Sequence, residues 1–300
     1  MGDRQVIFIL GVARSGTSAL ARVLSLCGCT LPGGLKEGNE GNPTGYWESL
    51  EVEKLINEFF LEHHTNYTDP TLCLQEEVSF TRQETQQYVG KIRAFLGRCP
   101  QVSQLLIKDP RITPLFDFWL QAAQAQALRV KAILAVRHPM EVAASLGEWA
   151  ARATIPASLE LRQAMWLKYN LLSERCTRQV PRVFTEYSSL LEDWRLQIAR
   201  ISRALELDLP TDAAAEVDAF LTPDLHRQRY AGPITETFGY PWVSDTYGTL
   251  VQAARDQPLD VARLDEIFRA YRTCERAFRT SLDDWRRRLP ARASQESSQD

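Results

Sequence analysis

A glycine-bounded turn near the N-terminus has the residue types that bind a phosphate or sulfate group. Residues 6–20 read VIFILGVARSGTSAL, so an apolar run leads into Gly11, a turn and the start of a helical pattern. Backbone N–H groups at such a helix start have no partner within the helix and therefore bind anions. Thr17 and Ser18 add hydroxyl donors, and Arg14 adds a cation. The alternative is a plain glycine turn with a solvated arginine.

The turn lacks the lysine of a nucleotide-hydrolysing phosphate loop. Its residues read GVARSGTS, and Thr17 stands where the pattern G-x-x-x-x-G-K-[ST] has lysine. Arg14, three residues earlier, supplies the positive charge instead, and a guanidinium can bind two oxygens of one anion at once. The sequence therefore favours an oxyanion site over magnesium-dependent hydrolysis of a nucleoside triphosphate.

A second segment, residues 134–146 with the sequence LAVRHPMEVAASL, carries another set of candidate anion ligands. Arg137 ends an apolar run, Pro139 suits the first turn of a helix, and Ser145 follows about two turns later. In a parallel sheet both turns open at the carboxyl edge, where ligands of this architecture bind. One ligand with two separated anionic groups would fit the pair.

The pattern along the chain predicts an α/β fold with a doubly wound, mainly parallel central sheet flanked by helices. Short apolar runs bounded by turn residues alternate with longer helical patterns. The expected strands are residues 5–10, 104–108, 130–136 and 181–186. The expected helices are residues 17–27, 49–63, 82–97, 113–126, 139–150, 158–178, 189–205, 212–221 and 259–288. We expect one domain over residues 1–290 and a disordered polar tail over residues 291–300.

Two stretches interrupt the alternation of strands and helices. Residues 28–47 are rich in Gly and Pro, and a loop of that length in a compact domain is usually functional. Residues 222–248 combine turn residues with aromatic ones, so we expect an irregular segment there. Its aromatic side chains either line a pocket or pack the segment onto the core.

Composition limits the partners. The 300 residues carry a formal net charge of −3, which gives no electrostatic basis for nucleic-acid binding. Six cysteines form no CxxC pair and no zinc-ligand spacing, so we expect free thiols and no metal site. No apolar run reaches the length of a transmembrane helix, and the N-terminal run is too short for a signal peptide. We therefore expect a cytoplasmic protein.

The pairing of GVARSGTS with RHPMEVAAS resembles the sulfotransferases that use 3′-phosphoadenosine-5′-phosphosulfate (PAPS). In that family the first motif holds the 5′-phosphosulfate and the second holds the 3′-phosphate. The family often has proline where this chain has Ala13, and often lysine where it has Arg14, although the arginine version also occurs. Further similarity to bacterial members comes from three segments: NPTGYWE (42–48), LLIKDPRI (105–112) and VFTEYSSLLEDW (183–194).

The resemblance implies a P-loop sulfotransferase fold and in-line transfer of the sulfuryl group from PAPS to a hydroxyl acceptor. The product of the donor is adenosine 3′,5′-bisphosphate (PAP), and no metal is required. The acceptor is expected to be a carbohydrate, a glycolipid or a natural-product alcohol. The implied donor ligands are Arg14, Ser15, Gly16, Thr17, Ser18, Arg137, Ser145, Tyr187 and Arg227. Of these, Tyr187 would reach the adenine, and Arg227 is an additional 3′-phosphate ligand or a solvated surface residue.

Three residues are candidates for the chemistry of transfer. Arg14 is expected to neutralise the charge that grows on the leaving phosphate. Glu48, at the end of the Gly/Pro-rich loop, is the candidate general base, or it only complements the dipole of the following helix. Lys108, beside Asp109 and Arg111, contacts the transferring sulfate or the acceptor, or these three form an internal ion-pair cluster. The rival bases are Glu37, Glu40, His63 and His64.

Two other classes of function remain open. A P-loop nucleotide kinase or NTPase would bind ATP or GTP with magnesium, and Thr17 in the lysine position is the feature against it. A non-catalytic homologue would bind adenosine bisphosphate tightly and transfer nothing. Binding and transfer assays separate the three classes.

Overall fold

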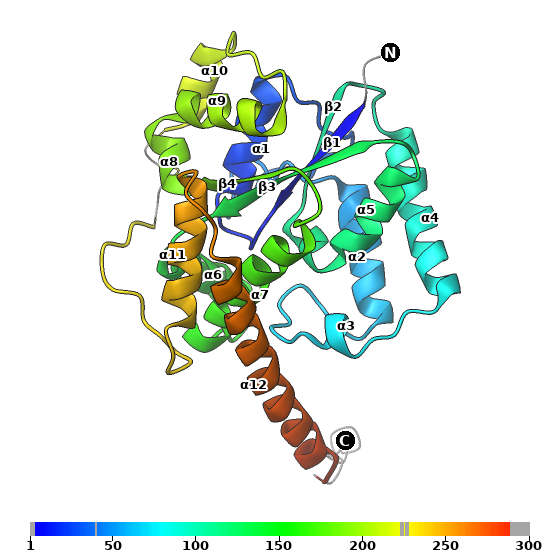
Figure 1. Ribbon diagram of the computed structural model, residues 1–300, viewed down its shortest axis with the longest axis vertical. Helices are drawn as coiled ribbons and strands as arrows, with labels where there is room; N and C mark the ends of the chain where they lie inside the picture. Colours follow the sequence, from blue (N-terminus) through cyan, green and yellow to red (C-terminus); the bar gives the residue numbers. More distant parts are fainter. Residues whose placement is uncertain (1–3, 40, 223–224, 226–227, 289–300) are drawn as a thin grey trace, which may run out of the picture.

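A central parallel sheet organises the chain in the computed structural model, which describes residues 4–39, 41–222, 225 and 228–288 (Figure 1). Its strands are β1 (Gln5–Leu10), β2 (Gln104–Lys108), β3 (Arg129–Val136) and β4 (Arg182–Glu186). They lie in the order β2-β1-β3-β4, and each neighbouring pair is parallel. The predicted α/β class and its parallel sheet are confirmed, with strand bounds within one residue of those expected from the sequence.

The inner strand β1 is buried on both of its faces. Val6, Phe8 and Leu10 point into one hydrophobic cluster, whereas Ile7 and Ile9 point into another on the opposite face. All five residues have no exposed surface. A continuous apolar run, rather than an alternation with polar residues, is what a parallel strand covered on both faces requires.

Helices cover both faces of the sheet. Figure 1 shows α1, α9 and α10 on one side and α2, α4, α5, α6 and α7 on the other. The helical elements are α1 (Thr17–Leu26), α2 (Leu50–Glu62), α3 (Cys73–Glu76), α4 (Arg82–Arg98), the 3₁₀ helix η1 (Pro110–Leu115), α5 (Phe116–Gln124), α6 (Pro139–Arg152), α7 (Leu159–Cys176), α8 (Tyr187–Glu192), α9 (Trp194–Leu205), α10 (Ala214–Phe220), α11 (Trp242–Ala254) and α12 (Val261–Arg288).

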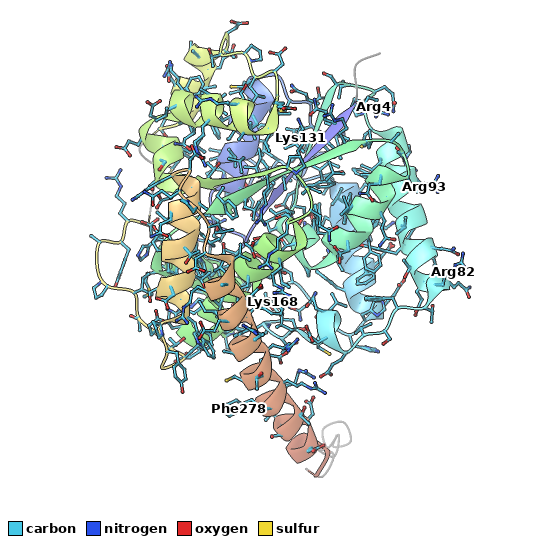
Figure 2. The ribbon with its side chains drawn as sticks, in the orientation of Figure 1. Arg4, Arg82, Arg93, Lys131, Lys168 and Phe278 are labelled. Carbon is cyan, nitrogen blue, oxygen red and sulfur yellow. The ribbon has the colours of Figure 1, made fainter. Side chains whose placement is uncertain are left out.

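The last helix, α12, begins on the body of the protein and extends away from it (Figure 1). Its first half buries Leu264, Ile267, Phe268 and Tyr271 against the core. Farther along, Phe278 is 79% exposed (Figure 2).

Some expected elements differ from those observed. The helix expected over residues 113–126 is η1 followed by α5, because Pro114 lies within the first part and lacks an N–H donor. The helix expected over residues 189–205 is divided at Asp193, whose carboxylate accepts a 2.9 Å hydrogen bond from the N–H of Leu196 and starts α9. The short helix α3 was not predicted.

The strand order creates a crevice at the carboxyl ends of β1 and β3. The chain leaves β1 toward β2 on one side, and it leaves β3 toward β4 on the other side. Ligands of open α/β sheets bind at such a switch point. The two turns that the sequence marks as anion-binding follow directly after these two strands.

Candidate active site

The glycine turn, residues 11–16, joins β1 to α1 in a conformation that depends on its two glycines. Gly11 has a φ of 128°, and a Cβ at this position would come within 2.8 Å of the Ala135 carbonyl oxygen on β3. Gly16 has a φ of 81°, and a Cβ there would overlap the ring of Tyr187. Both positions therefore exclude larger residues. No side chain caps α1, so the N–H groups at its start remain available to a ligand.

Arg14 adopts the left-handed conformation with a φ of 71°, which is uncommon for a residue other than glycine. Its Nε donates a 2.9 Å hydrogen bond to Ser145 Oγ on α6, and its Nη2 donates to the Gly41 carbonyl at 3.2 Å. Burial lowers the pKa of Arg14, and the nearby charge of Arg137 lowers it further. Since no carboxylate among the described residues pairs with Arg14, its charge is open to an anionic ligand.

Arg137 follows β3 and holds the glycine turn from the opposite side of the crevice. Its Nη1 donates to the Arg14 carbonyl at 2.9 Å, and its Nε donates to Glu141 Oε2 at 2.8 Å. Its Nη2 donates to the Gln228 carbonyl at 3.1 Å, and the guanidinium lies 4.6 Å from the ring centroid of Tyr187. These hydrogen bonds use three of the five N–H groups of the guanidinium. A phosphate bound here would accept hydrogen bonds from the Arg137 guanidinium while Glu141 stays paired with it.

A network of buried and partly buried ion pairs, the Glu48 cluster, joins the end of β2 to the start of α2 and consists of five residues: Glu48, Glu53, Lys108, Asp109 and Arg111. Glu48 Oε1 lies 2.5 Å from Lys108 Nζ, and Glu48 Oε2 lies 3.2 Å from Arg111 Nη2. Arg111 also pairs with Asp109 at 2.6 Å and with Glu53 at 2.9 Å. The cluster matches the alternative in which Lys108, Asp109 and Arg111 form internal ion pairs, and it includes the candidate base.

Lys108 links the Glu48 cluster to the start of α1. Its Nζ donates to Ser18 Oγ at 3.1 Å and to the Tyr46 carbonyl at 3.0 Å, besides its contact with Glu48. The side chain is only 2% exposed. An anion bound at the start of α1 would therefore meet Ser18 and Lys108 together.

The protonation of Glu48 reflects two opposing effects. Burial raises the pKa of the Glu48 carboxyl, and this effect outweighs the positive charges of Lys108 and Arg111, which act to lower it. A raised pKa makes the carboxylate a better proton acceptor at neutral pH. Both oxygens already accept a hydrogen bond from a cation, Oε1 from Lys108 and Oε2 from Arg111, so a proton taken by Glu48 goes to the second lone pair of one oxygen or displaces a cation.

A cavity of about 340 Å³ at this edge of the sheet brings most of the candidate residues together. The candidate residues that line it are Arg14, Gly16, Thr17, Ser18, Glu48, Lys108, Arg111, Arg137, Ser145 and Tyr187. Its wall also contains residues to which the sequence analysis gave no role: Lys36, Asn42, Tyr46, Tyr67, Trp149 and Arg152. Asn42 and Tyr46 lie in the segment NPTGYWE, whereas no motif includes the other four.

Other candidate residues lie outside this cavity. Ser15 is buried beneath the turn, and its hydroxyl has no hydrogen-bond partner among the described residues. Glu37 is exposed. The ring of His63 packs on that of Phe59, with 4.4 Å between the ring centroids. Neither Glu37 nor His63 lines the cavity, and nor does His64. Glu40 and Arg227 lie outside the described residues, as does the tail 291–300.

The segment 222–248 is more regular than expected, because α11 begins within it at Trp242. The ring of Trp242 packs on those of Phe238 and Tyr271, so these aromatic residues hold the segment on the core. Leu225 and Gln228 line the cavity that holds the candidate residues, and neither is aromatic. A neighbouring cavity, also of about 340 Å³, is lined in part by Tyr230 and Tyr247. Both interpretations of the aromatic residues therefore apply, each to different side chains.

Comparison with known proteins gives similar solved structures but no close relative. The chain matches no protein-family model and no curated protein sequence. It is similar to the sulfotransferase domain of an olefin synthase from Synechococcus PCC 7002, with 18% identity over 90% of this chain and 96% of that chain and a TM-score of 0.43. A mouse sulfotransferase complexed with PAP has 14% identity over 78% of this chain and 70% of that chain, with a TM-score of 0.41.

A sulfotransferase from Alicyclobacillus acidocaldarius has 17% identity over 75% of this chain and 94% of that chain, with a TM-score of 0.39. These three structures are sulfotransferases, the family that the motifs of this chain resemble. At such identities and TM-scores the comparison assigns neither a donor nor an acceptor to this chain. Among the described residues, no helix is long and apolar enough to cross a membrane.

Proposed function

We propose that this chain transfers the sulfuryl group of PAPS to a hydroxyl acceptor and releases PAP. The observation that carries the proposal is the 2.9 Å hydrogen bond from Arg14 Nε to Ser145 Oγ. It joins one residue of each motif across 131 positions of sequence, at the switch point of a parallel sheet. Two anion-binding turns that open into one cavity suit a ligand with two separated anionic groups.

The 5′-phosphosulfate would bind at the glycine turn. The N–H groups at the start of α1 supply donors for its oxygens, and so does Arg14, which has no carboxylate partner among the described residues. The Ser18 hydroxyl donates to the Tyr46 carbonyl at 3.2 Å and would have to turn from it to join them. The 3′-phosphate would bind beside Arg137 and Ser145, where the guanidinium has N–H groups left for a ligand. Tyr187 lies between the two, under Arg137 and against Gly16, where an adenosine would cross.

In the transfer step the acceptor oxygen attacks the sulfur atom as the bond from sulfur to the 5′-phosphate oxygen of PAP breaks. Negative charge then grows on the leaving phosphate, and Arg14 with the start of α1 stabilises it. The acceptor proton passes to Glu48, whose pKa burial has raised. Lys108 contacts both Ser18 and Glu48, so it stands where the sulfuryl group would lie between donor and base.

The acceptor would enter along the wall formed by Tyr46, Trp149 and Arg152. Trp149 is 36% exposed, and it lines the cavity together with Tyr46. Aromatic faces of this kind stack on sugar rings and on planar rings alike. This wall is consistent with a carbohydrate, a glycolipid or a natural-product alcohol as the acceptor.

Thermal melting tests the donor. PAP should raise the melting temperature strongly without magnesium, because a ligand that binds only the folded state stabilises it by mass action. ATP should stabilise the protein much less. Stabilisation by ATP that equals that of PAP and requires magnesium would replace this proposal with a nucleotide kinase or NTPase.

Transfer itself is tested with isotopically labelled PAPS and cell extracts, followed by mass detection of a gained sulfuryl group. Tight PAP binding without transfer to any acceptor would mark a non-catalytic homologue.

A further inference from the structure

Tyr67 lies in the cavity although it belongs to neither anion-binding motif. The backbone N–H of Ala13, within the glycine turn, donates a 3.1 Å hydrogen bond to the Tyr67 hydroxyl oxygen. A phenolic hydroxyl can accept one hydrogen bond and also donate one. Among the described residues no acceptor takes the O–H of Tyr67, and the residue lines the cavity. The unused proton is therefore available to a ligand.

The hydroxyl of Tyr67 remains a donor at neutral pH. Burial raises the pKa of Tyr67 above its ordinary value, against the smaller effect of the Ala13 hydrogen bond. The negative charge of Glu48 raises this pKa as well. The group thus keeps its proton and can donate it to an anion, but it cannot serve as a base.

The Tyr67 loop, residues 65–72, is fixed to α7 by side chains that bind its backbone carbonyls. The hydroxyl of Tyr169 donates to the Tyr67 carbonyl at 3.0 Å, and the ring centroids of the two tyrosines lie 5.4 Å apart. The ammonium of Lys168 donates to the Asp69 carbonyl at 2.8 Å. Both α7 residues are buried, so these carbonyls have little access to water as an alternative partner.

Two residues near the middle of α12 fix the other end of the same loop. The hydroxyl of Tyr271 donates to the Pro70 carbonyl at 2.6 Å. The N–H of Leu72 donates to Glu275 Oε1 at 3.0 Å. Four backbone groups of the loop are thus held from two helices, which places the Tyr67 hydroxyl at the glycine turn before any ligand arrives.

We propose that Tyr67 is a ligand-binding residue that donates its O–H to the oxyanion held at the glycine turn while it accepts the N–H of Ala13. The identity of that oxyanion, the 5′-phosphosulfate of PAPS, rests on the function proposed above. A hydroxyl that accepts a hydrogen bond from an amide is a stronger donor, because linked hydrogen bonds polarise one another. The residue would therefore bind the 5′ group of the donor and of PAP, and not the 3′-phosphate.

Calorimetric titration of Tyr67→Phe with two nucleotides measures this role. Affinity for PAP should fall roughly 10- to 100-fold, as for loss of a hydrogen bond to a charged group. Affinity for adenosine 3′-monophosphate, which lacks the 5′ group, should stay within about twofold, since the lost donor does not face the 3′-phosphate. Tyr88→Phe is the matched control, because the buried Tyr88 hydroxyl has no hydrogen-bond partner in the described part of the chain and does not line the cavity.

Incorporation of 3,5-difluorotyrosine at position 67 separates ligand binding from a purely structural role. Fluorination makes the hydroxyl a better donor and a poorer acceptor. If Tyr67 donates to the anion, PAP should bind at least as tightly as to the natural protein. If Tyr67 only accepts the N–H of Ala13 to fix the turn, PAP should bind more weakly, and that result would overturn the proposal.

Inorganic pyrophosphate separates this proposal from the proposed function, because it probes the glycine turn without a nucleotide. Tighter binding of pyrophosphate to the natural protein than to Tyr67→Phe supports the role of Tyr67 even if PAP does not bind. If the natural protein and Tyr67→Phe bind PAP equally well and also bind pyrophosphate equally well, Tyr67 does not have this role. The proposed function would then still stand. A natural protein that binds neither probe contradicts both proposals.

Discussion

Arg14 and Arg137 are neighbours, but they differ in their ion-pair partners. Arg137 already pairs with Glu141, whereas Arg14 has no carboxylate partner among the described residues. We therefore expect Arg137→Ala mainly to weaken PAP binding. Arg14→Ala should lower kcat roughly 10²- to 10³-fold, because its contact strengthens as charge develops on the leaving phosphate. Steady-state kinetics and PAP titration of both variants measure the difference.

Arg82→Ala is the control for this comparison, since Arg82 is exposed on α4 and does not line the cavity (Figure 2). An Arg14→Ala protein with a loss of affinity alone and normal kcat would contradict the role given to Arg14.

The role of Glu48 can be separated from its ion pairs by substitution with an amide of the same shape. If Glu48 is the general base, Glu48→Gln should lower turnover roughly 10²- to 10⁴-fold while PAP affinity barely changes. Activity of the natural protein should fall as pH drops through the carboxyl pKa, at a higher pH than for an ordinary glutamate, because burial raises this pKa. The variant should lack this acid limb in its pH–rate profile.

Glu53→Gln is the matched control, because Glu53 also pairs with Arg111 in the Glu48 cluster but is not the candidate base. If Glu48→Gln retains near-normal turnover, Glu48 is only a partner of Lys108 and Arg111.

The sequence predicts which residues of a motif belong to the site. It does not predict site residues that come from distant segments of the chain and reach the site only through the fold. Arg14, Arg137 and Ser145 each stand at fixed spacing from a strand end, so the motif itself indicates their position. Tyr67 meets Ala13 across 54 residues, and that contact depends on where α2 ends and how α7 and α12 hold the loop. No local pattern encodes such a contact.

At the scale of elements, α12 should control the cavity through the Tyr67 loop although it does not line it. Tyr271→Phe removes the hydrogen bond to the Pro70 carbonyl, so the free energy of unfolding should fall by about 1 kcal/mol. Amides of residues 65–72 should exchange with deuterium faster, and PAP affinity should fall because Tyr67 is held less firmly. Denaturant unfolding measures the free energy of unfolding, hydrogen exchange measures the opening of the loop, and titration measures the affinity for PAP.

Phe278→Ala on the exposed part of α12 serves as the control and should change none of these quantities. Unchanged exchange in Tyr271→Phe would show that the loop does not need α12.

Helices and strands with a clear pattern of apolar residues were predicted well. Elements whose start depends on tertiary contacts were not. The strands contain short apolar runs, continuous over Val6–Leu10 in β1, that a sheet covered on both faces buries, so their positions follow from the sequence. The helix α11 was missed because Pro241 and the surrounding aromatic residues give the pattern of an irregular segment. Its start is fixed by Glu236, whose carboxylate accepts the N–H groups of Val243 and Ser244, and this contact is visible only in the fold.

For the molecule as a whole, Lys168 should make stability depend on pH. Burial lowers its pKa from 10.5 to about 8 in the folded protein. The unfolded chain therefore binds this proton more tightly, and the free energy of unfolding should rise with pH between these two values. The natural protein should gain about 3 kcal/mol over that window relative to Lys168→Gln, which has no such proton.

Urea unfolding of both proteins across the alkaline range measures this gain, with Lys54→Gln, an exposed lysine on α2, as the control. A constant difference between natural protein and Lys168→Gln at all pH values would contradict the lowered pKa.

The strand order also affects how the protein folds during its synthesis on the ribosome. The first strand made, β1, is one of the two inner strands, and its partners β2 and β3 begin only at Gln104 and Arg129. At usual translation speeds the apolar run VIFIL stays without either neighbour for on the order of ten seconds after it is synthesised. A nascent chain arrested before β2 should therefore crosslink to chaperones through this run. PAP should protect arrested chains from protease only once Tyr187 has left the ribosomal tunnel.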